Sequence, residues 1–205
     1  FTQTDGSTST TINGVLTNAA TFDFTGNALS LLGSGNNTST VFETTNSGTF
    51  TTGDGAALVV NGAITENGSG DSVIGDDVTS TTGAINFNSA VTLTSTDAIT
   101  IQTGEGNNDD LTITGNLAET NNPNLTIDAG EAGDINIDGT VNLGTGSLTI
   151  TDAAIVDFAQ TVALNGFTQT DGSTSTTING VLTNAATFDF TGNALSLLGS
   201  GNNTS

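Results

Sequence analysis

Residues 135–154 read INIDGTVNLGTGSLTITDAA, and they contain three apolar pairs whose members are one residue apart, Ile135/Ile137, Val141/Leu143 and Leu148/Ile150. Two apolar residues that flank one outward residue are typical of a very short β-strand, because successive side chains of a strand point to opposite faces. The segments between the pairs are rich in Gly, Asp and Thr, which favour tight turns. The stretch therefore predicts three short strands joined by turns.

The same pattern recurs in threes from residue 85 to residue 164. Pairs of the first series begin at 85, 111, 135 and 156, and those of the third at 99, 125 and 148. Pairs of the second series begin at 91, 141 and 162, and Leu117 stands alone in the remaining slot of that series. The inserted residues follow the third strand, in TGEGNND, AGEAGD and TDAA. This spacing predicts an all-β fold, a parallel β-helix (β-solenoid) with three short strands per coil of roughly 21 residues. The handedness rule for parallel crossovers favours a right-handed coil.

The first half of the chain is less regular. One coil is predicted from Thr10/Ile12, Leu16 and Phe22/Phe24, and another begins at Leu29/Leu31 with Thr40/Phe42 as its third strand. Phe50, Leu58/Val60 and Ile64 belong to one or two further coils. Residues 67–82 show weak spacing, which predicts a longer loop or an irregular coil.

Residues 1–39 recur without a change at 167–205, so the period is 166 residues. This repetition predicts that 1–166 is one full tandem unit and that 167–205 begins the next identical unit, continuous with the first. A unit of this length is expected to make about eight coils, or ~38 Å of axis at the usual strand spacing. Exact repetition favours a task that is itself repetitive, such as building length.

The composition excludes several classes of function. The chain has 21 Asp and Glu residues but no Lys, Arg, His, Cys, Met, Trp or Tyr. A surface for nucleic acid or anionic lipid is therefore excluded, and no apolar run is long enough for membrane insertion. Only Asp76/Asp77 and Asp109/Asp110 could resemble the paired catalytic carboxylates of glycosidases. Neighbouring residues in a strand point to opposite faces, so such neighbours make poor catalytic pairs. We therefore predict that the protein is not an enzyme.

Calcium is the one cofactor that the sequence suggests, although none is required. GSGDSVIGDD from Gly68 and GEGNNDDLTI from Gly104 resemble degenerate copies of the calcium-binding nonapeptide of repeats-in-toxin proteins. The candidate ligands are Asp71, Asp76, Asp77, Asp109 and Asp110. The alternative is a diffuse cation atmosphere, since the carboxylates amount to about one charge per 2 Å of axis, close to the charge density of DNA.

A column of outward threonines runs along the third strand of successive coils, at Thr100, Thr126, Thr149 and Thr168. Flat threonine arrays on β-solenoids resemble the ice-binding faces of several proteins, so ice binding is a third functional hypothesis. The alternative is that threonine simply suits an exposed strand position.

Segments such as LTITGNLAE and the stretch from residue 135, set in long identical repeats, resemble filamentous-haemagglutinin-type adhesins and giant repetitive bacterial surface proteins. The resemblance implies a right-handed β-helix, an extracellular or cell-surface location, and a role in attachment or coating. We therefore expect a structural repeat of a long acidic filament or adhesin stalk. Its partners would be neighbouring copies, stacked end to end or bundled laterally by cations. A calcium-dependent or ligand-binding module is the alternative.

Overall fold

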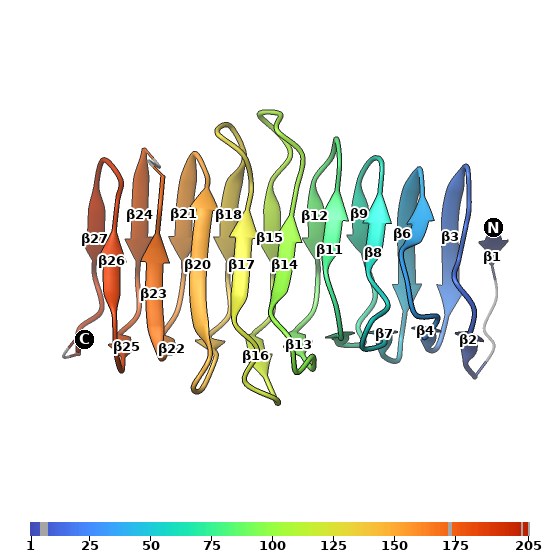
Figure 1. The fold of residues 1–205 in the computed structure, drawn as a ribbon, viewed down its shortest axis with the longest axis horizontal. Helices are drawn as coiled ribbons and strands as arrows, with labels where there is room; N and C mark the ends of the chain where they lie inside the picture. The colour runs from blue at the N-terminus through green and yellow to red at the C-terminus, as the bar shows by residue number, and fades with distance from the viewer. Residues whose placement is uncertain (5–7, 172–173, 202, 205) are drawn as a thin grey trace.

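A computed structural model describes residues 1–4, 8–171, 174–201 and 203–204. In these residues the chain forms 27 short strands and no helix, and the strands make three parallel sheets. The sheets wrap a single elongated β-solenoid with the two termini at opposite ends (Figure 1). The predicted all-β parallel β-helix with three strands per coil is confirmed.

We name the three sheets A, B and C in the order in which the chain visits them. Sheet A contains β1 (Thr2–Gln3), β3 (Thr21–Gly26), β6 (Val41–Asn46), β9 (Ile64–Glu66), β12 (Ile85–Phe87), β15 (Leu111–Ile113), β18 (Asp134–Ile137), β21 (Ile155–Phe158), β24 (Ser175–Ile178) and β27 (Leu195–Leu197). Sheet B contains β2 (Thr10–Ile12), β4 (Leu29–Leu31), β7 (Phe50–Thr52), β10 (Ser72–Ile74), β13 (Val91–Leu93), β16 (Leu117–Glu119), β19 (Val141–Asn142), β22 (Val162–Leu164) and β25 (Leu182–Asn184). Sheet C contains β5 (Asn37–Ser39), β8 (Leu58–Val60), β11 (Val78–Ser80), β14 (Ile99–Gln102), β17 (Leu125–Asp128), β20 (Ser147–Asp152), β23 (Gly166–Gln169) and β26 (Phe188–Phe190).

Each strand pairs with the strand one coil further along, so the backbone hydrogen bonds between coils run along the axis. Ile85 lies opposite Leu111, and Leu111 lies opposite Ile135, so the apolar pairs stack in register. These inward side chains are fully buried and form one continuous core. In Figure 1 the chain rises along the front sheet C and descends along sheet A behind it as it advances from right to left, which is a right-handed coil.

The segment 67–82 is not the irregular coil that the sequence predicted. It contains β10 and β11, and both strands pair in register with their neighbours on either side. The pattern was hidden because one inward position of each strand holds a serine, Ser72 or Ser80, in place of an apolar residue. Ser80 Oγ donates a hydrogen bond to the Gly62 carbonyl at 2.8 Å and accepts one from Gly83 N at 2.9 Å, so this serine is satisfied within the core.

Polar inward residues also hid the strand β5. Asn37 and Ser39 point inward and are buried, and Asn37 Oδ1 accepts a hydrogen bond from Leu16 N at 2.9 Å. The prediction that Thr40/Phe42 forms the third strand of its coil was wrong, because that strand is β5 and Thr40 is exposed. Phe42 is the first buried residue of β6, which lies on sheet A. Polar side chains thus replace apolar residues at several coils without interrupting the stack. Asn37 and Ser80 bond to the backbone, whereas the Oγ atoms of Ser39 and Ser72 have no hydrogen-bond partner among the described residues.

The interior near the N-terminus is aromatic. Phe1, Phe22 and Phe42 stack along the axis on sheet A with ring centroids 4.7 and 4.9 Å apart, and Phe50 on sheet B packs against Phe42 with a tilted ring at 5.4 Å. Rings separated by one coil spacing fall in the range that offset-stacked aromatic pairs prefer. The column therefore ties successive coils together from the inside.

Candidate functional site

Both ends of the solenoid leave apolar residues exposed. At the N-terminal end Phe1 is 47% exposed, and at the C-terminal end Leu197 is 38% exposed, whereas its counterpart Leu31 is fully buried. A hollow at the C-terminal end is lined by Leu182, Phe188, Leu197, Asn203 and Thr204. These surfaces are the interior of the coil seen from above and below, so a further coil would bury them.

The two identical copies show what such a further coil does. Phe1 is half exposed, whereas its counterpart Phe167, which lies on a preceding coil, is fully buried. Conversely Phe22 is fully buried beneath the coil that follows it, whereas its counterpart Phe188 is only partly buried. Each copy thus buries the residues that the other leaves open. The same sequence has a complete core only when coils lie on both sides of it.

Strand β23 crosses the boundary between residues 166 and 167. It pairs in register with β20 before it and with β26 after it. Phe167 stacks on Phe188 with ring centroids 5.1 Å apart, as Phe1 stacks on Phe22. The backbone ladder therefore runs through the point where one copy of the repeat would follow another.

The five predicted calcium ligands lie at three different corners of the coil. Asp71 is in the turn between sheets A and B, and Asp76 and Asp77 are in the turn between B and C. Asp109 and Asp110 are in the turn between C and A. The structure therefore does not bring the candidates near Gly68 together with those near Gly104. It also places Asp71 at a different corner from Asp76 and Asp77.

Four of these carboxylates accept hydrogen bonds from nearby backbone amides. Asp76 accepts from Asp77 N at 2.7 Å, and Asp77 accepts from Thr100 N at 2.7 Å. Asp109 accepts from Gly106 N at 2.8 Å, and Asp110 accepts from Asp134 N at 2.8 Å. Each thus caps a turn or the start of a strand. Within the described ranges no group of three or more Asp or Glu residues is arranged to hold a metal ion.

Sequence reasoning missed an acidic ridge along the corner between sheets C and A. Its carboxylates are Asp110, Asp128, Glu131, Asp134, Asp152 and Asp171. Asp128 lies directly opposite Asp152 on the neighbouring strand. Partial burial, followed by the negative charges of Asp171, Asp128 and Glu131, raises the pKa of Asp152. Partial burial and the charge of Asp110 likewise raise the pKa of Asp134, so the ridge is a region of unrelieved like charge.

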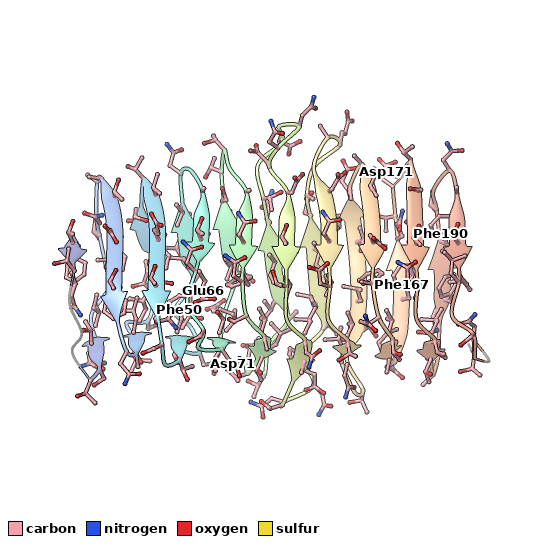
Figure 2. The ribbon with its side chains drawn as sticks, turned by 180° about the vertical axis from the view of Figure 1, so that it is seen from behind. Phe50, Glu66, Asp71, Phe167, Asp171 and Phe190 are labelled. Atoms are coloured by element: carbon pink, nitrogen blue, oxygen red, sulfur yellow. The ribbon has the colours of Figure 1, made fainter. Side chains whose placement is uncertain are left out.

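A second missed residue is Glu66, which occupies an inward position of β9 and is only 1% exposed (Figure 2). Burial raises the pKa of Glu66, hydrogen bonds from Ser89 Oγ and Gly68 N oppose this rise, and the nearby charge of Asp71 adds to it. The two bonds are 2.8 and 2.6 Å long. Because the chain has no Lys, Arg or His, no side chain can offer this carboxylate a counter-charge.

The predicted threonine column is present and in register. Thr100, Thr126, Thr149 and Thr168 are successive partners on sheet C. The next position after Thr168 is Asp189, and on the other side Asp77 bonds to the Thr100 amide. The column is therefore four residues long and is bounded by carboxylates.

No protein-family model, no curated protein and no solved structure matches this chain. The described residues include no helix with the length and apolar character needed to cross a membrane.

Proposed function

We propose that the chain is a section of a long, acidic extracellular filament or adhesin stalk, in which 166-residue units follow one another along one β-solenoid. The observation that carries this proposal is the continuity of the solenoid across the junction of the two copies, where β23 pairs in register on both sides and Phe167 is fully buried. A unit whose core continues without a break into the next unit is suited to a task in which neighbours are always present. The partner of each unit is then another copy of the same unit.

The composition supports a location outside the cell. A chain without Lys or Arg has no trypsin cleavage site, and a chain without Cys, Met, Trp or Tyr offers little to oxidants. Both properties suit a durable surface fibre. The resemblance to tandem-repeat adhesins points the same way.

Particle length should grow in proportion to the number of units. Chains of two, four and six 166-residue units are expected to appear as unbranched rods that lengthen by about 37 Å per unit, because each unit spans 23 strand positions, or seven and two-thirds coils, and coils stack at ~4.8 Å. Electron microscopy of the purified chains measures this length directly. Rods of constant length, or globular particles whose diameter grows with mass, would contradict the proposal.

A cation-dependent module is the second candidate, and the acidic ridge is the observation that favours it. With a net charge of −21 and no basic side chain, the protein must attract cations from solution. The turn-capping bonds of Asp109 and Asp110 favour a diffuse atmosphere over an ordered site.

We therefore expect Ca²⁺ and Mg²⁺ to raise the melting temperature to a similar extent, and Asp109→Asn to leave that response unchanged. An ordered calcium site would behave differently, since saturation at 100 times its Kd stabilises by about 2.7 kcal/mol. Thermal unfolding with Ca²⁺, with Mg²⁺ and after chelation separates the two cases. A calcium-specific rise in melting temperature that Asp109→Asn abolishes would establish the ordered site. The matched control is Asp97→Asn, which changes an exposed carboxylate in a turn away from the ridge.

A further inference from the structure

The two identical copies of residues 1–39 and 167–205 do not lie on the same sheets. Residues 2–3 form β1 of sheet A, but their counterparts 168–169 lie in β23 of sheet C. The apolar pair Phe22/Phe24 lies in sheet A, and its counterpart Phe188/Phe190 lies in sheet C. Every paired segment of the second copy is displaced in the same sense, by one sheet.

The displacement is not a difference in local folding. Thr2 pairs with Asp23 in the first copy as Thr168 pairs with Asp189 in the second. Thr10 pairs with Leu29 as Thr176 pairs with Leu195. Side-chain bonds are also reproduced, since Leu16 N donates to Asn37 Oδ1 at 2.9 Å and Leu182 N donates to Asn203 Oδ1 at 2.8 Å. The two copies therefore have the same local fold, but the second is rotated by one sheet about the solenoid axis.

The cause is the number of strand positions in one repeat. Strands β1 and β21 are the first and eighth of sheet A, so seven whole coils separate them, and β22 and β23 add two thirds of a coil. A period of 166 residues therefore spans seven and two-thirds coils, not the eight that the sequence suggested. The three sheets accept the same sequence because each demands only a short strand with two inward residues.

We infer that in a tandem array each 166-residue unit is turned by one third of a coil relative to the unit before it. Every surface feature then appears on the three faces in turn and returns to the same face at every third unit, after 23 coils or about 110 Å. This inference rests on the proposed function, because it needs units that follow one another.

The turn of one third of a coil per unit limits which surface features can form a continuous array along the filament. The acidic ridge lies between sheets C and A in one unit, so it lies between B and C in the next and between A and B in the third. The threonine column moves in the same way from sheet C to sheet B, so no single face carries a continuous threonine array. No face of the filament therefore presents the continuous threonine array that a flat lattice such as ice would need.

Cross-linking of paired cysteines in the 205-residue chain tests the displacement, and the absence of native cysteine leaves no background. Thr149 and Thr168 are in-register partners on sheet C, whereas Asp157 lies on sheet A. We expect T149C/T168C to cross-link at least about tenfold faster than D157C/T168C, because a disulfide needs Cα atoms within ~7 Å. Preferential cross-linking of D157C/T168C would place the second copy on the sheet of the first and overturn the inference.

A six-unit chain tests the array itself. With Thr45→Cys, an exposed position on sheet A, in every unit and a gold label on each thiol, we expect labels about 37 Å apart that step by about 120° around the axis. Asn142→Cys on sheet B should give the same steps. Labels aligned on one face of a rod of the expected length would overturn only the one-third turn between units. A rod that fails to lengthen would overturn the proposed filament itself.

Discussion

Replacing Phe22 with alanine should lower the free energy of unfolding by about 3–5 kcal/mol, the usual cost of emptying a fully buried aromatic site. Phe22 is completely buried between Phe1 and Phe42, and its ring stacks on both. Its removal leaves a cavity in the aromatic column that neighbouring coils, held in place by their own hydrogen bonds, cannot easily close.

The repeat supplies a matched control, because Phe188 has the same sequence neighbours as Phe22 but lies near the open end of the stack. Phe188→Ala should cost only about 1–2 kcal/mol, since a partly exposed ring has less transfer free energy to lose. Thr45→Ala, on an exposed outward position, should change stability by less than about 0.5 kcal/mol. Urea titration followed by far-UV circular dichroism is the suitable measurement, as the chain contains no Trp or Tyr. Equal losses at Phe22 and Phe188 would show that the core does not depend on neighbouring coils.

Glu66→Gln should stabilise the protein at pH 8 by about 1–3 kcal/mol, the typical cost of leaving a buried polar group poorly matched. The amide keeps an oxygen for the Gly68 amide and adds N–H donors. Thr44 lies in the in-register position of the neighbouring strand, and among the described residues its Oγ1 makes no hydrogen bond that would compete for such a donor. The variant therefore removes an unpaired interior charge and keeps the shape of the side chain.

The effect of Glu66 should depend on pH in a defined direction. Because burial raises the pKa of Glu66, the folded state binds this proton more tightly than the unfolded state does. The associated stability is fully present below the unfolded pKa of about 4.3 and is lost as the pH rises through the raised folded pKa. The difference between Glu66→Gln and wild type should thus be small at pH 4 and grow towards pH 8. Glu43→Gln, an exposed carboxylate on the neighbouring strand, is the control, and a pH-independent difference at Glu66 would contradict this account.

The fold could be predicted wherever both inward residues of a strand are apolar. From Ile85 to Leu164 nearly every strand has such a pair, and the structure confirms the predicted coils. Prediction failed at Asn37, Ser72 and similar positions, because inward polar residues carry no periodic apolar signal. Asn37 is tolerated because it bonds to the backbone in the folded coil, whereas Ser72 Oγ is buried without a hydrogen-bond partner among the described residues.

The candidate site was less accessible to sequence reasoning, for two physical reasons. Clustered carboxylates in turns indicate ligands, but which corner each turn occupies depends on the number of strands before it, as the separation of Asp71 from Asp76 shows. The burial of Glu66 did leave a signal, because Glu66 follows Ile64 at the spacing of an inward pair. The one-sheet displacement of the repeat could likewise be found only by counting strand positions such as β5, whose inward residues are polar.

The axial direction of the hydrogen bonds between coils has a mechanical consequence. A load along the filament pulls one coil away from the next and breaks their bonds in succession, whereas a load across the filament leaves them intact. Each coil that peels away releases about 21 residues, which span roughly 70 Å when extended, in place of the ~4.8 Å that the coil occupied. The proposed filament would therefore lengthen severalfold under tension before its covalent chain bears the load.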